Sequence, residues 1–282
     1  MTADQQARHD SEYQSLLALY ITLLKSLRTS DKENALYALS ELRTEIAFNY
    51  VLDGLGIDYD TATTLLMSEG DNNLTQHDKD LRDRIKAAIQ NLIDFSVCEE
   101  YQLFDETLEA LGDDEIDFNS DEYDELLLIC QKYNDTYSAI ENADIAYAGT
   151  IAARWITMSA SDWVMYWTMN DAKVRPWHMA LQGYAAPRDE FPSWMIPPIE
   201  YNCRCYLEWL EVPTANASLK QIKGSARDVV KPQQLSDVYS ESLAKCGRIF
   251  GPSHNYFSVK ERDKDMLNNF VLKLRVKYYG KN

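Results

Sequence analysis

The spacing of apolar residues changes near residue 150, and this change limits the fold more than any other feature of the sequence. Before residue 150, apolar side chains recur every three or four positions, which is typical of one face of an α-helix. Three such stripes are Leu16, Leu17, Tyr20, Leu23, Leu24 and Leu27; Leu36, Leu39, Leu42, Ile46 and Tyr50; and Leu81, Ile85, Ala88, Ile89 and Leu92. After residue 150, aromatic residues and clustered prolines replace this spacing, which indicates a compact, turn-rich region.

Polar residues and glycines indicate where the first helices begin and end. Ser30 and Glu33 form a capping box that opens a helix, and Gly54 is expected to stop it. A longer helix is expected to run from near Thr75 to Gly112. These signals predict that the helical region contains several separate helices with short connections.

A further helix is predicted to begin at Ser120, because the acidic residues at 121–125 are favoured at a helix N-terminus. We expect it to continue in broken form towards Ala153. The predicted fold class is α+β, in which a mainly helical N-terminal half precedes a small compact α+β motif domain with a short antiparallel sheet and a helical C-terminal tail. The expected elements after residue 150 are strands at 163–169 and 206–212, a polar connector at 214–232, and helices at 235–243 and 265–279.

The net charge of −17 is unevenly distributed along the chain. Residues 1–150 hold 32 acidic and 10 basic residues, a net charge of −22, whereas residues 151–282 hold 13 and 18, a net charge of +5. We therefore predict an acidic helical domain over 1–150 and a motif domain with a C-terminal helical extension over 151–282. Because phosphates would repel it, the first domain is not expected to coat DNA, and it suits docking onto a basic protein partner.

Two further patterns limit the location and the ligands of the protein. No apolar run approaches the roughly 20 residues that span a bilayer, and residues 1–11 lack a signal-peptide pattern. We therefore expect a cytoplasmic protein, or one packed into a particle there, with no membrane partner. Residues 113–124 carry carboxylates at alternate positions as a calcium loop does, but Phe118 stands where such a loop needs glycine, so a solvated acidic loop is expected.

The stretch from Asp171 to Cys205 contains an ordered series of short motifs. It reads D-x-x-V-R-x-x-H-x-x-L-x-G, then Phe-Pro-x-Trp, then Pro-Pro, and it ends in Asn-Cys-Arg-Cys. The series resembles the signature of the Mu F-like head morphogenesis family, with Tyr201 where many members have Trp or His. The matching positions are Asp171, Val174, Arg175, His178, Leu181, Gly183, Phe191, Trp194, Pro197, Pro198, Asn202, Cys203, Arg204 and Cys205. A second family element, with Asn255 in place of its proline, is resembled by Ile249, Phe250, His254, Tyr256 and Phe257.

The resemblance implies a minor capsid protein that acts in head morphogenesis of a tailed phage or prophage. Such a protein associates with the portal or the inner capsid during assembly. Its implied partners are the portal protein and the capsid and scaffold proteins, with an indirect association with packaged DNA. The implied location is the phage head in the virion, and the host cytoplasm during assembly.

The motif residues are interpreted as a structural core. Arg175 offers a planar set of donors that suits a carboxylate, with Asp171 as the near candidate for an internal salt bridge. Gly183 is expected to adopt a backbone conformation that other residues resist, and the side chain of Asn202 is expected to hold a turn. The predicted core comprises Asp171, Arg175, His178, Gly183, Trp194, Pro197, Pro198, Asn202, Cys203, Arg204 and Cys205.

The five cysteines are odd in number and lack the spacing of a disulfide framework. Cys203 and Cys205 would point to the same side of a strand. Together with His178 their thiolates suit zinc, and His254 is the obvious fourth ligand. Because C-x-C is an uncommon zinc spacing, a reduced, hydrogen-bonded core without a cofactor is the expected state, and zinc is the alternative.

No enzymatic motif stands out. The sequence contains no P-loop, no G-x-S-x-G and no H-E-x-x-H, so we assign no catalytic residues and do not expect an enzyme. The alternative hypothesis is a metal-dependent, nuclease-like hydrolase, or a toxin-type effector packaged in the head, with His178, Asn202 and His254 around the metal. A cysteine nucleophile at Cys203 or Cys205 activated by His178 is a further alternative.

Overall fold

The computed structural model describes residues 2–68, 70, 73–112, 116–210 and 236–280. Contacts divide the chain into two compact units, each formed from separate segments. The first unit comprises Met1–Tyr50, Ile89–Ala143 and His254–Asn282, and the second comprises Val51–Ala88 and Asp144–Ser253. Helices α2 (Lys32–Leu55), α4 (Gln76–Leu111) and α6 (Ser138–Ile156) contribute residues to both units.

These compact units differ from the division at residue 150. Val51–Ala88 belongs with later residues, and His254–Asn282 belongs with earlier ones. The reason is that charge reports the composition of the surface, whereas compactness depends on which apolar faces are buried together. Whether 1–150 and 151–282 behave as separate domains stays a prediction.

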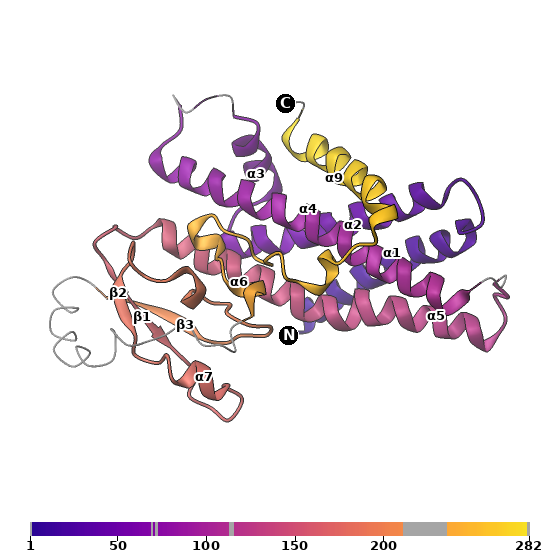
Figure 1. Ribbon diagram of the computed structural model, residues 1–282. Coiled ribbons are helices and arrows are strands. Elements are labelled where there is room, and N and C mark those ends of the chain that lie inside the picture. The colour runs from indigo at the N-terminus through magenta and orange to yellow at the C-terminus, as the bar shows by residue number, and fades with distance from the viewer. Residues whose placement is uncertain (1, 69, 71–72, 113–115, 211–235, 281–282) are drawn as a thin grey trace. The chain divides into compact units, whose positions relative to one another are not determined.

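The first unit is built from helices (Figure 1). Helices α1 (Ala3–Ser26), α5 (Asp121–Gln131) and α9 (Lys264–Tyr279) lie wholly within it. The apolar stripe of α9 is buried at Leu267, Phe270, Leu274 and Tyr278, as its spacing predicts. The Phe270 ring lies 5.4 Å from that of Tyr37, and the Tyr278 ring lies 5.3 Å from that of Phe48, so α9 packs on α2.

The broken helix predicted after Ser120 is confirmed. Ser120 caps α5 by accepting a hydrogen bond from the backbone N–H of Tyr123. The chain then passes through a π-helical turn, Lys132–Tyr137, into α6. Single π-helical turns inside helices are rare and often accompany functional features.

The second unit contains a three-stranded sheet and short helical elements. Strand β1 (Trp163–Trp167) lies between β2 (Ala185–Pro187) and β3 (Tyr206–Leu210), and both pairings are antiparallel (Figure 1). On β3, Trp163 pairs with Leu210 and Trp167 with Tyr206. Helix α3 (Tyr59–Leu66) and the four-residue helix α7 (Pro176–Met179) also lie in this unit.

One face of this sheet carries the core of the second unit. Val164 and Tyr166 of β1 and Leu207 of β3 are buried against Ile151 and Trp155 of α6. The same cluster continues into the motif and includes Leu181, Phe191, Met195, Ile199, Cys203 and Cys205. The apolar residues and the two cysteines of the predicted motif therefore form part of the hydrophobic core of this unit.

Two glycines bring α2 and α6 together at an unusually short distance. A Cβ atom added to Gly54 would lie 2.0 Å from the carbonyl oxygen of Ala146, and one added to Gly149 would lie 2.6 Å from that of Val51. The prediction that Gly54 stops α2 is therefore wrong. The helix ends at Leu55, and Gly56, at φ +73°, takes the left-handed conformation that follows it.

The predicted α+β fold is confirmed, with one helix wrongly placed. Instead of a helix at 235–243, the described residues form 3-10 turns at Asp237–Tyr239 and Leu243–Lys245. The side chains of Ser236 and Ser242 each cap one of these turns, a role that competes with helix continuation. The predicted connector 214–232 and the end of the strand 206–212 lie outside the described residues, as does the start of the acidic loop 113–124. Within the described parts of the chain, no helix is long and apolar enough to cross a bilayer.

Candidate functional site

The centre of the motif is His178, which is 2% exposed. Its position follows from α7, which begins with Pro176 at a first-turn position that tolerates proline. The Nε2 atom of His178 lies 3.2 Å from a carboxylate oxygen of Glu200. Since a carboxylate only accepts hydrogen bonds, Nε2 carries a proton, and in the neutral imidazole Nδ1 then presents its lone pair on the opposite side of the ring.

Two thiols face that lone pair. The Sγ atoms of Cys205 and Cys203 lie 3.3 Å and 4.0 Å from His178 Nδ1. The two cysteines are 2% and 5% exposed, and they lie on the same side of the chain as predicted. All three candidate ligand atoms lie within 4.8 Å of one another. The prediction that His178 and the two thiols come together is therefore confirmed by the geometry.

Two tyrosines enclose the thiols. The Tyr147 hydroxyl of α6 donates a hydrogen bond to the carbonyl oxygen of Cys205 at 2.5 Å. Tyr166 of β1 is 0% exposed, and its hydroxyl is directed at the Cys205 thiol. No hydrogen bond of ordinary geometry satisfies that hydroxyl among the residues the structure describes. Burial, followed by the charge of the two cysteines, raises the pKa of Tyr166, so the hydroxyl keeps its proton.

The two thiols influence each other's pKa. The hydrogen bond between them lowers the pKa of Cys205 and raises the pKa of Cys203, and burial raises the latter further.

Two ion pairs surround the centre, and they differ from the predicted pair of Arg175 with Asp171. Arg175 Nε lies 3.0 Å from the Glu200 carboxylate, and its Nη2 donates to the carbonyl oxygen of Tyr201. Asp171 instead accepts two hydrogen bonds from Arg204, at 2.7 and 2.9 Å. These bonds lower the pKa of Asp171. Several carboxylates in the sequence could pair with each arginine, and the fold determines which pairs form.

The backbone of the motif also departs in part from expectation. Gly183 has φ +82°, which confirms its predicted special conformation, and its N–H donates to the carbonyl oxygen of Tyr166. Asn202 is exposed and has φ +55°, which asparagine tolerates better than most residues. Its backbone N–H, rather than its side chain, holds the turn by donating to the buried carboxylate of Asp144 at 2.9 and 3.1 Å. Pro197 and Pro198 are buried just before this turn, and Trp194 is partly buried against the core.

His254 is not part of this centre, which corrects its prediction as the fourth ligand. It belongs to the first unit, where its ring lies 5.1 Å from that of Phe95. Its Nδ1 accepts a hydrogen bond from the backbone N–H of Tyr256, and burial lowers its pKa to about 4. The sequence named His254 because a structural zinc site needs a fourth ligand, and spacing along the chain does not show which residues meet.

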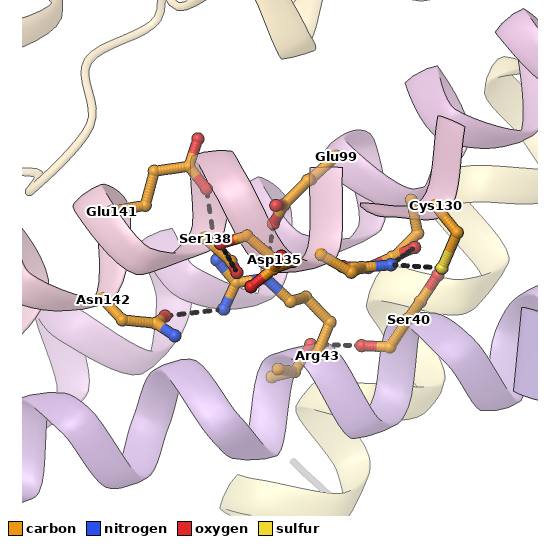
Figure 2. Close-up of polar contacts among 11 residues, drawn as sticks. Ser40, Arg43, Glu99, Cys130, Asp135, Ser138, Glu141 and Asn142 are labelled. Carbon is orange, nitrogen blue, oxygen red and sulfur yellow. Dashed lines mark hydrogen bonds and ion pairs between the residues drawn. The ribbon is translucent and has the colours of Figure 1, made fainter. Parts of the chain in front are cut away.

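The first unit contains a buried polar network that was not predicted from the sequence. Arg43 is 0% exposed and lies among Glu99, Glu141 and Asn142 (Figure 2). Its Nε is 2.7 Å from Glu99, its Nη2 is 3.3 Å from Glu141, and its Nη1 donates to Asn142 Oδ1 at 2.9 Å. Because Glu100 is also buried nearby, three carboxylates accompany one guanidinium.

Burial dominates the protonation of these carboxylates. It raises the pKa of Glu99 and Glu141, and it raises the pKa of Glu100 to about 7, in each case against the opposing charge of Arg43. The sequence contained a signal for this network, since Glu99 lies two helical turns after Leu92 and so continues the apolar face of α4. Glu100 is the next residue. Glu200, Tyr166 and Asp144 were missed around the motif because nothing local distinguishes them from other acidic and aromatic residues.

Comparison with known proteins agrees with the motif. Residues 129–208 match the model of a family described as Phage Mu protein F like protein, which confirms the resemblance based on residues 171–205. The matched region begins earlier than expected and includes the π-helical turn and α6, which packs directly on the sheet. It ends before His254, so the second family element at 249–257 stays a prediction. Neither the curated proteins nor the solved structures that were compared include a significant match.

Proposed function

We propose that this protein is a minor capsid protein of a tailed phage or prophage that acts in head morphogenesis and associates with the portal or the inner capsid. The observation that carries the proposal is the match of residues 129–208 to the Phage Mu protein F like family. Within it, residues 144–208 belong to one compact unit, in which Ile151 and Trp155 of α6, the sheet and the motif share one core.

The chemistry of the motif supports a role in shape rather than turnover. His178, Cys203 and Cys205 are between 2% and 5% exposed, so a substrate would have to displace core side chains to reach them. The two outer ion pairs join segments far apart in sequence, Asp171 to Arg204 and Arg175 to Glu200. Such contacts stabilise a fixed surface that a partner can recognise. The alternative of a metal-dependent hydrolase or packaged effector has no comparable support.

The charge distribution indicates the kind of partner. Residues 1–150 carry a net charge of −22, which favours association with a basic protein surface and opposes direct contact with DNA. The described acidic residues of the first turn of α5, Asp121, Glu122 and Asp124, are exposed and available to such a surface. Portal and scaffold proteins of the same phage are the proposed partners.

Co-purification with the portal protein encoded by the same phage tests the proposal. The tagged full chain is co-expressed with that portal protein, and the complex is followed by size-exclusion chromatography at increasing salt. We expect co-elution that weakens as salt rises, because screening shortens the reach of the acidic surface. The portal protein of an unrelated phage is the control. Equal retention of both portal proteins, or of neither at low salt, contradicts the proposed association.

A further inference from the structure

We propose that His178, Cys203 and Cys205 bind a structural zinc ion in the core of the second unit. The proposal is independent of the assembly role, because it concerns what holds this unit together rather than what the unit contacts. It starts from the ligand atoms, all of which are buried and within 4.8 Å of one another. Two thiols and one imidazole are a ligand set that zinc uses in proteins.

The distances fit a tetrahedral ion after small shifts. With Zn–S of about 2.3 Å and Zn–N of about 2.0–2.1 Å, tetrahedral angles place the imidazole nitrogen about 3.5 Å from each sulfur. The observed separations from His178 Nδ1 are 3.3 Å to Cys205 and 4.0 Å to Cys203. One sulfur therefore needs to move by a few tenths of an ångström, which a cysteine rotamer adjustment provides.

The surroundings of His178 are those of a metal ligand. Its Nδ1 lone pair faces the sulfurs, while Nε2–H donates to Glu200, which is itself held by Arg175. Metal-binding histidines usually donate their second N–H to a carboxylate in this way, which fixes the tautomer and the ring orientation.

The fourth position has a candidate oxygen donor. The Tyr166 hydroxyl is fully buried, directed at Cys205, and lacks a hydrogen bond of ordinary geometry within the described structure. Burying a hydroxyl without a well-formed hydrogen bond is unfavourable. A zinc ion beside Cys205 resolves this cost, because Tyr166 can then bind the ion or hold a water molecule that does.

Zinc binding releases protons from the cysteines. Both sulfurs bind as thiolates, so any proton on Cys203 or Cys205 leaves to solvent, and His178 binds as a neutral imidazole that keeps its Nε2 proton. The two thiolates cancel the ion's double positive charge. The buried site is therefore neutral overall, which suits its apolar surroundings of Leu207 and Phe191.

Metal analysis of the full chain tests the proposal. The protein is purified under reducing conditions without chelator, and zinc is measured by mass spectrometry of the elements. We expect about one zinc per chain, in line with a structural site. Cys203→Ser and Cys205→Ser should each lose most of the metal, whereas Cys246→Ser, at an exposed cysteine outside the site, should retain it.

Cobalt substitution separates loss of the site from loss of the fold. Co²⁺ added to metal-free wild-type protein should give the visible bands of a tetrahedral ion and the near-ultraviolet band of cobalt–thiolate bonds. Circular dichroism of every variant reports whether it is folded, and Glu200→Gln should bind zinc about 10–100-fold more weakly while remaining folded. Tyr166→Phe should change the cobalt spectrum if its oxygen occupies or supports the fourth position.

Three results would overturn the zinc site. The first is folded, reduced wild-type protein that contains no zinc and develops no cobalt–thiolate band. The second is equal zinc in the wild type and in folded Cys203→Ser and Cys205→Ser variants. The third is a metal-free protein lighter by two hydrogen atoms, with the cysteines resistant to alkylation, which indicates a Cys203–Cys205 disulfide. None of these results bears on whether the chain associates with a portal protein.

Discussion

Replacing Arg43 with methionine should destabilise the first unit by about 3–5 kcal/mol near neutral pH, the usual cost of removing one partner from a buried ion pair. Arg43 is 0% exposed and is the cation that accompanies Glu99 and Glu141, at 2.7 and 3.3 Å. Methionine has a similar length and leaves little cavity, so most of the cost comes from the two carboxylates left without a positive charge. They can respond only by binding protons, since water does not reach them.

The pH dependence follows from the direction of the pKa shifts. Burial already raises the pKa of Glu99 and Glu141 above the values of the unfolded chain, against the charge of Arg43. Without Arg43 both folded pKa values rise further, and a raised folded pKa gives stability at low pH that is lost as pH rises. Between the unfolded pKa and this raised folded pKa, the variant should lose up to about 1.4 kcal/mol per pH unit and per carboxylate. Because its folded pKa values lie above those of the wild type, its loss continues to a higher pH, so the cost of the substitution grows as pH rises.

Urea unfolding followed by circular dichroism at pH 5 and pH 8 measures this loss. Arg262→Met is the matched control, because the Arg262 side chain is 72% exposed and forms an ion pair with its neighbour Asp263 at 3.4 Å. Surface changes of this kind stay within about 0.5 kcal/mol. Adding Glu99→Gln to Arg43→Met should recover part of the loss at pH 8. A cost equal to that of Arg262→Met, or one that shrinks as pH rises, refutes the reasoning.

Two further predictions concern single side chains. Gly149→Ala should destabilise the protein by about 1–3 kcal/mol despite the better helix propensity of alanine, because the new Cβ would lie 2.6 Å from the carbonyl oxygen of Val51. Thermal unfolding measures the loss, with Thr150→Ala at an exposed position as the control. A rise in melting temperature for Gly149→Ala contradicts the prediction. Glu100→Gln should leave stability nearly unchanged at pH 4.5 and raise it at pH 8. Burial raises the pKa of Glu100 in the folded protein to about 7. The wild type therefore loses stability between about pH 4.5 and 7, because the unfolded state releases the proton first. Parallel pH profiles of variant and wild type would contradict that assignment.

Local patterns in the sequence predicted the helices and strands well, because their causes are local. The helix ending at Gly112, the cap at Ser120 and the buried stripe of α9 follow from spacing and capping within one segment. Gly54 shows the limit of such reasoning. Glycine commonly ends a helix, but the role of Gly54 is set by the close approach of α6, some 90 residues further along the chain.

The candidate site was predicted in part for the same reason. The C-x-C spacing places Cys203 and Cys205 on one side of the chain, and this holds in the structure. The partners of Arg175 and Arg204 were not predictable, since Asp171 and Glu200 are chemically equivalent choices and only the three-dimensional register separates them. The exclusion of His254 likewise depends on its burial beside Phe95, which no spacing along the chain reveals.

The proposed function makes this chain a component of a phage head. Quantitative mass spectrometry of purified, nuclease-treated particles tests it most directly, with the portal protein as an internal reference for copy number. We expect peptides from both residues 1–150 and residues 151–282 in particles, at a few copies for each portal assembly. Abundant protein in the host lysate together with its absence from assembled heads and their precursors would rule out the proposed function.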